Sequence, residues 1–185
     1  MADSRHTTQE RTRPSPETDN LLRTMSTPSN TLSLDDYDRK ILHILQEDGR
    51  ISNQALSERV NLSPSPCLRR VRALEEAGYI TGYRATVDER KLGYDLHIML
   101  MISMDKHTPE RFEQFEARVR KLPEVQDCLL ITGHDADYML RVRVADMDDY
   151  EHLLLHHITK IPGVAGAHSS FVLRTVFQER HLHLG

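Results

Sequence analysis

The chain has 185 residues, with 24 Lys and Arg against 28 Asp and Glu and a formal net charge of −4. Its 38% hydrophobic and 28% charged residues are typical of one or two soluble domains, and no apolar run approaches the roughly 20 residues that span a bilayer. Two cysteines are too few for a disulfide framework, and no apolar leader follows Met1. We therefore expect a cytoplasmic protein that makes no contact with membranes.

Residues 1–31 differ in composition from the rest of the chain. They contain three prolines, many Ser and Thr, and only scattered apolar residues. Such a segment buries too little apolar surface to offset its ordering entropy. We expect a disordered tail over 1–31.

Three short helices are predicted over 32–84. The first begins at Asp35, a good N-cap, and ends before Gly49, and Ser52 caps the second. The third is expected over 64–77, with Ser63 as N-cap, a proline at its first position and Gly78 after its end. Three helices joined by tight turns are typical of a helix-turn-helix unit.

Residues 79–87 are rich in β-branched and aromatic side chains around one glycine, which predicts strands that form a wing or an arm. We interpret residues 85–95 as a linker between two domains. The acidic balance of the whole chain argues against nucleic-acid binding through bulk charge, but it leaves room for a local basic patch.

An internal repeat marks the second half of the chain. The sequence KLPEV at 121–125 recurs 39 residues later as KIPGV at 160–164, each time after an amphipathic helix and before a strand. Strands are expected at 97–104, 125–131, 138–144 and 167–176. The order βαββαβ indicates an α+β fold with a ferredoxin-like domain over 96–177, followed by a C-terminal tail over 178–185.

The expected strands at 97–104 and 125–131 contain segments that are apolar on both faces, at 98–102 and 128–131. The two helices cover only one face of such a sheet, and a bare apolar face is unusual in a monomer. We therefore expect a homodimer, and a higher homo-oligomer beyond it.

The third helix carries the local basic patch. Between residues 50 and 84 there are six arginines and three glutamates, and the pattern directs Ser65, Arg69, Arg70 and Arg72 outward. Arginine matches phosphates and the guanine edge, and a helix fits the major groove of DNA. The pattern favours a DNA-reading helix, although many trihelical units bind protein instead.

Several ordered motifs resemble the leucine-responsive regulator/AsnC family of transcription regulators. They are LDDYDRKIL at 34–42, DGRIS at 48–52, LSPSPCLRRV at 62–71 and GYITGY at 78–83. The likeness extends from about residue 34 to 176. It implies a winged helix-turn-helix joined by a strand-forming linker to a ferredoxin-like domain that oligomerises and binds small effectors, commonly amino acids.

The resemblance also implies a DNA-binding surface. Ser65, Pro66 and Arg69 would lie nearest the base edges, and Arg70 and Arg72 on phosphates. Further contacts to the DNA backbone would come from the start of the third helix and of the second, at Ser63, Ser52, Asn53 and Gln54. Asn61 stands where the family usually has glycine; asparagine tolerates positive φ, so we expect the turn to survive.

The family's effector cleft lies where the turn between the second and third strands meets a neighbouring subunit. Here that turn is residues 132–138, and it is one residue longer than the family's Gly-x-x-Asp spacing, so Asp135 and Asp137 both remain candidates for the ammonium acceptor. The other effector residues that the resemblance implies are Leu130, Gly133, Met147, Ser170, Phe171 and Val172. Carboxylate, backbone amides and apolar walls together suit a zwitterion.

Two rival classes stay open. His152 and His156 are one helical turn apart, with His157 adjacent, and a metalloenzyme would need a third ligand that the sequence does not place. The trihelical unit could also be a protein-interaction module attached to an oligomeric ligand-binding domain. We favour a non-enzymatic, sequence-specific DNA-binding regulator that needs no cofactor and responds to a small amino acid.

Overall fold

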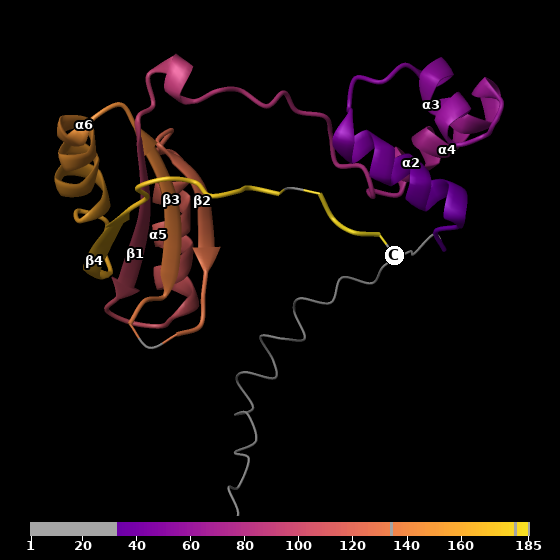
Figure 1. The fold of residues 1–185 in the computed structure, drawn as a ribbon. Coiled ribbons are helices and arrows are strands. Elements are labelled where there is room, and N and C mark those ends of the chain that lie inside the picture. Colours follow the sequence, from indigo (N-terminus) through magenta and orange to yellow (C-terminus); the bar gives the residue numbers. More distant parts are fainter. Residues whose placement is uncertain (1–32, 134, 180, 185) are drawn as a thin grey trace, which may run out of the picture. The chain divides into compact units, whose positions relative to one another are not determined.

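The computed structural model describes residues 33–133, 135–179 and 181–184, so the predicted disordered tail over 1–31 lies outside the described residues. The chain divides into two compact units (Figure 1). The helical unit takes in the described residues up to Arg84 together with those from His181 onward, and the sheet unit takes in those between. No helix of the described residues is long and apolar enough to cross a membrane.

The helical unit contains the three predicted helices. They are α2 (Asp36–Glu47), α3 (Asn53–Arg59) and α4 (Pro64–Glu76). Helix α2 begins with a reciprocal capping box, in which Asp35 accepts from the backbone N–H of Asp38 and Asp38 accepts from that of Asp35. The fully buried side chains of Ile41, Cys67 and Leu74 join the helices in one core.

The turn between α3 and α4 has the backbone that the sequence predicts. Asn61 has a φ of 58°, a left-handed conformation that asparagine tolerates better than any other non-glycine residue. The Asn53 side chain donates from Nδ2 to the carbonyl of Pro64 at 2.9 Å, which ties the start of α3 to the start of α4. Gly78, with a φ of 77°, follows the end of α4, as predicted.

The prediction of strands over 79–87 is wrong for this chain by itself. No strand forms there among the described residues, and residues 81–87 are exposed. A strand needs a hydrogen-bonding neighbour, and none of the described strands pairs with these residues. The hydroxyl of Tyr83 instead donates to Glu75 on α4 at 3.0 Å.

The sheet unit has the predicted βαββαβ order and forms one antiparallel sheet in the order β2-β3-β1-β4. A single turn of 3₁₀-helix, η1 (Arg90–Leu92), precedes it. The elements are β1 (Leu96–Met104), α5 (Pro109–Val119), β2 (Val125–Leu130), β3 (Tyr138–Val144), α6 (Met147–His152), η2 (Leu153–Ile158) and β4 (Val164–Phe171). This strand order and helix placement confirm the α+β ferredoxin-like fold.

One face of the sheet packs against both helices. Alternate residues of β1 and β3, such as Ile98, Leu100 and Leu140, are fully buried together with Phe115 of α5 and Leu153 of η2. The residues between them, which point to the other face, are only half-buried. The helices therefore cover a single face of the sheet.

Two details of the sheet unit differ from the expectation. The second helix continues from α6 into a π-helix, η2, which the sequence did not predict, so that its buried residues Leu153 and Ile158 lie five positions apart. Strand β4 begins at Val164 and ends at Phe171, earlier than predicted at both ends. Beyond Phe171 a single further hydrogen bond joins the two strands, from Val172 N–H to the His97 carbonyl, because β1 itself begins at Leu96.

Candidate DNA-binding and effector sites

The exposed face of α4 gathers three of the predicted DNA-reading residues. Ser65, Arg69 and Arg72 lie at successive helical turns and line a shallow hollow of about 330 Å³. Neither arginine is within ion-pairing distance of a carboxylate in the part of the chain that the structure describes. Both guanidinium groups are therefore available to an external anion.

Arg70 points away from this face. Its Nη1 lies 2.8 Å from carboxylate oxygens of both Asp35 and Asp38, and its guanidinium carbon is 5.3 Å from the centroid of the Tyr37 ring. The Asp38 N–H first, and Arg70 in addition, lower the pKa of Asp35. Arg70 thus joins α4 to the first turn of α2.

Two of the other predicted DNA contacts, Ser52 and Gln54, have hydrogen-bond partners inside the helical unit. Ser52 accepts from the N–H of Ala55 at 3.2 Å and caps α3, and Gln54 donates to Glu58 at 2.8 Å. Pro66 is half-buried and Ser63 exposed at the start of α4. Ser63 is the N-cap, as predicted, but within the described residues its side chain makes no capping hydrogen bond.

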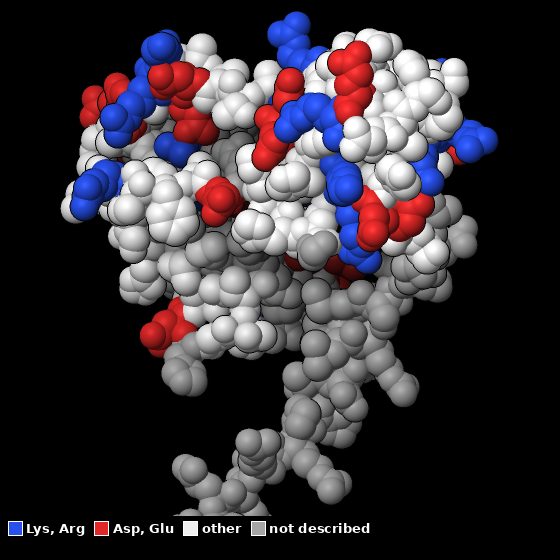
Figure 2. Space-filling model, turned by 45° about the vertical axis from the view of Figure 1, so that its right-hand side comes forward, with Lys and Arg blue, Asp and Glu red and all other residues white. Residues whose placement is uncertain are grey.

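The surface charge is mixed. Figure 2 shows Lys and Arg side chains beside Asp and Glu on the face in view, without a continuous field of one sign. This agrees with the net charge of −4. Attraction to an anionic partner therefore depends on local groups such as the outward face of α4.

The turn between β2 and β3 gives its two aspartates different surroundings. The Asp137 carboxylate accepts from the N–H of Met104 at 2.7 Å and lies 2.7 Å from His107 Nε2, so it ties the turn to the end of β1. Asp135 is exposed, and it is its backbone carbonyl that accepts from Ser103 at 2.8 Å. The Asp135 carboxylate is free of partners among the described residues.

The predicted effector residues fall into two groups at opposite ends of the sheet. Leu130, Gly133, Asp135 and Asp137 lie at or beyond the end where Ile102 pairs with Tyr138. Met147, Ser170, Phe171 and Val172 lie near the end where Ile98 pairs with Phe171. Four residues along the strands correspond to roughly 13 Å, and three strand spacings between the two edges to about 14 Å. A single chain does not bring the two groups together.

The histidines of the second helix form an aromatic cluster. The His152 ring centroid lies 5.0 Å from that of His156 and 5.2 Å from that of His157. Among the described residues no group of three or more His, Cys, Asp or Glu side chains is arranged to hold a metal ion. The sequence offered these histidines as metal candidates, and it gave no signal that His156 and His157 line a hollow together with Arg118, Lys121 and Lys160.

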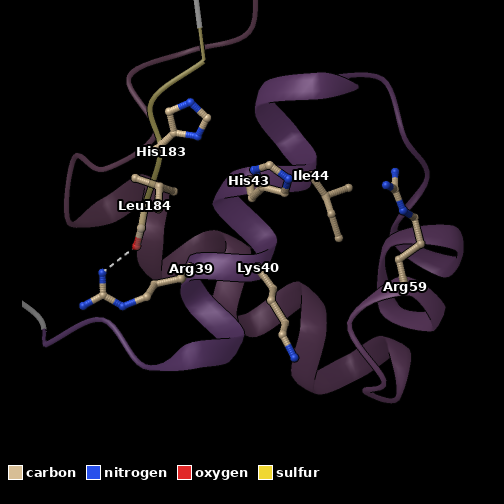
Figure 3. A pocket seen from close by; sticks show the side chains of 7 residues that line it. All are labelled: Arg39, Lys40, His43, Ile44, Arg59, His183 and Leu184. Carbon is tan, nitrogen blue, oxygen red and sulfur yellow. Dashed lines mark hydrogen bonds between the residues drawn. The ribbon is translucent and has the colours of Figure 1, made fainter.

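The C-terminal residues contribute to the helical unit. Gln46 of α2 both accepts from the N–H of Leu182 at 2.7 Å and donates to its carbonyl at 3.2 Å, and Arg39 donates to the Leu184 carbonyl at 3.0 Å. Figure 3 shows the resulting hollow of about 540 Å³. It is lined by Arg39, Lys40, His43, Ile44, Arg59, His183 and Leu184. Because Leu184 packs on the helical core, we interpret the hollow as the edge of a docked segment.

Comparisons with known proteins agree with the geometry of both units. Residues 34–81 match the family model of a winged helix-turn-helix DNA-binding domain, and residues 97–182 match that of the Lrp/AsnC ligand binding domain. The chain thus combines a DNA-binding unit with a ligand-binding unit, which is the organisation of a transcription regulator.

Individual relatives specify the family. The leucine-responsive regulatory protein of Escherichia coli K12 is 46% identical over 149 residues, which cover 80% of this chain and 90% of that protein. A transcriptional regulator of Neisseria meningitidis, solved as a complex with L-Met, has a TM-score of 0.79 and 42% identity over 82% of this chain and 97% of its own. E. coli AsnC has a TM-score of 0.72 and 27% identity over 79% of this chain and 96% of its own. The chain belongs to the Lrp/AsnC family of transcription regulators.

Proposed function

We propose that this regulator is a homo-oligomer that binds specific DNA sequences through α4 and responds to a small amino acid bound between subunits. The observation that carries the proposal is the separation of the predicted effector residues into two groups at opposite ends of the sheet. A site that needs both groups is completed only when the β2–β3 turn of one subunit meets the β4 end of another.

The two groups are chemically complementary to a zwitterion. The free Asp135 carboxylate is an acceptor for an ammonium group, while exposed Met147 and Phe171 offer apolar surface to a side chain. The Neisseria relative, solved with L-Met, supports an amino acid as the ligand class. Asp137 is assigned to holding the turn in place.

Exposed apolar side chains support assembly. Leu173 and Phe177 are 93% and 81% exposed after β4, and Leu129 of β2 is about half exposed. Isolated chains rarely leave so many large apolar groups in water, because apolar burial is a main driving force of association. We infer that a second copy covers this surface.

For DNA binding, Arg69 and Arg72 of α4 have no ion-pair partner among the described residues and are free to contact base edges and phosphates. We assign Arg70 to positioning, because its guanidinium already holds two carboxylates. The relatives of this chain are named as regulators, which favours a non-enzymatic role. These relatives are bacterial, and the chromosomal DNA of a bacterium lies in the cytoplasm.

The proposal is tested by calorimetric titration of the full-length protein with each common amino acid, accompanied by light scattering and DNA-binding isotherms. We expect at least one amino acid to bind and to change either the assembly state or the affinity for DNA from the gene's own upstream region. Binding of an amino acid to a protein that stays monomeric throughout would contradict a site between subunits.

A further inference from the structure

A second hollow in the sheet unit lies apart from the predicted effector residues. It has a volume of about 380 Å³, within the range of roughly 300–1,000 Å³ typical of small-molecule sites. It is lined by Arg118, Lys121, Leu122, His156, His157, Lys160 and Ile161. The end of α5 and the turn after it form one wall, and η2 with its following turn forms the other.

The internal repeat builds this hollow. Lys121 and Lys160 are equivalent residues of the two copies, and each is followed by an apolar residue, Leu122 or Ile161, that packs against the core. The apolar pair forms the floor, and the exposed lysines stand above it. The π-helix places both His156 and His157 along the wall, and π-turns are frequent at functional sites.

Every polar side chain in the hollow is basic. Arg118, Lys121 and Lys160 carry fixed positive charges, and none of them is within ion-pairing distance of a carboxylate of the described residues. By contrast, Arg141 and Arg143 of the same unit each form an ion pair. The dipole of a single helix favours one or two cations at its C-terminus. Here the C-terminal ends of α5 and of η2 both place their basic side chains in the same hollow.

The donors suit an anion with several oxygen atoms. The ammonium of Lys160 lies 3.3 Å from Nδ1 of His156, so these two side chains from the same wall meet in the hollow. The Arg118 guanidinium can bind phosphate oxygens in pairs. We propose that this hollow binds a small anion with two or three linked phosphates, either free polyphosphate or the phosphate chain of a nucleotide. A compact anion fits a concave site of this size better than a DNA duplex does.

The experiment is isothermal titration of the full-length protein with tripolyphosphate and, separately, with ATP. Because α4 also attracts anions, the comparison is made between variants of the same chain. Lys121→Gln with Lys160→Gln is expected to weaken tripolyphosphate binding at least about tenfold, since two charge-assisted contacts are lost. Arg120→Gln, an exposed neighbour outside the hollow, is the matched control and is expected to change it less than about twofold.

The results distinguish a nucleotide from free polyphosphate as the ligand, and they distinguish both from a DNA contact. Tighter binding of ATP than of tripolyphosphate identifies a nucleotide site, and equal affinity identifies a site for the phosphate chain alone. Absence of binding by the wild type, or equal losses in the double variant and the Arg120→Gln control, overturns the proposal. So does a double variant that keeps its tripolyphosphate affinity and loses affinity for random duplex DNA, which would make the hollow a DNA contact.

Discussion

Arg69 and Arg70 are adjacent in the chain but act on different parts of the molecule. Arg69 points outward from α4, whereas Arg70 holds the carboxylates of Asp35 and Asp38 at the start of α2. Asp38 is buried, and Arg70 is the cation that lies against its carboxylate. Arg70 therefore adds a charged contact to the apolar core that joins α4 to α2.

Arg70→Gln is expected to lower the free energy of unfolding of the helical unit by about 1–3 kcal/mol, because it leaves a buried carboxylate without its cation. Urea denaturation followed by circular dichroism measures this loss. Arg69→Gln is the matched control, with a change within about 0.5 kcal/mol in stability and a loss of about 1–3 kcal/mol at the cognate DNA site. Unchanged stability with weaker DNA binding in Arg70→Gln would show that Arg70 contacts phosphate.

Low pH should destabilise the N-terminal end of α2. The pKa of Asp35 is lowered, chiefly by the backbone N–H of Asp38 that its carboxylate accepts. A lowered pKa stabilises the folded state above the unfolded value of about 3.9, and this stabilisation disappears as the pH falls through the folded value. Asp35→Asn keeps a side-chain oxygen that can cap α2, but the amide side chain does not ionise. Thermal unfolding between about pH 6 and pH 3 should show a smaller acid loss in the variant; equal losses would contradict this role.

Substitution of the two aspartates of the β2–β3 turn should have different effects, one on stability and the other on ligand binding. Asp137→Asn is expected to cost about 1–3 kcal/mol of stability, since it removes a charged acceptor from the half-buried Met104 N–H contact. Asp135→Asn should leave the melting temperature unchanged and abolish amino-acid binding. Calorimetry and thermal unfolding of both variants check this, and full binding by Asp135→Asn would exclude it as the ammonium acceptor.

At the scale of elements, the α3–α4 turn depends on the left-handed backbone of Asn61. Asn61→Val is expected to destabilise the helical unit by about 1–2 kcal/mol, because a β-branched residue is strained at positive φ. Asn61→Gly should be at least as stable as the wild type. Urea denaturation of both variants tests this expectation, which fails if valine is tolerated as well as glycine.

Local signals in the sequence predicted those elements whose determinants are local. Caps and prolines placed α2, α3 and α4, and the repeated KLPEV and KIPGV segments revealed the βαββαβ order. Residues 79–87 have strand-forming side chains but no neighbouring strand among the described residues, and the π-helix η2 has no periodic signature of its own. The roles of Arg70 and Asp137 depend on partners far away in the sequence, which spacing alone does not supply.

At the scale of the whole molecule, we expect effector binding and subunit assembly to be linked. The turn carrying Asp135 lies at one end of the sheet and Met147 at the other, so the site we propose requires at least two chains. A ligand that binds only assembled subunits stabilises the assembly by the same free energy with which assembly strengthens its binding. Any response of DNA binding then follows from the arrangement of paired α4 helices.

Subunit complementation tests this central claim most directly. Asp135→Asn and Met147→Asp each disable one half of the site, and the second places an acid at a helix start, where it is tolerated. Coexpressed in equal amounts, the two variants should recover about a quarter of the wild-type amino-acid sites, because some sites pair two intact halves from different chains. Recovery of no sites in mixed oligomers, with each variant folded, would contradict a site shared between subunits.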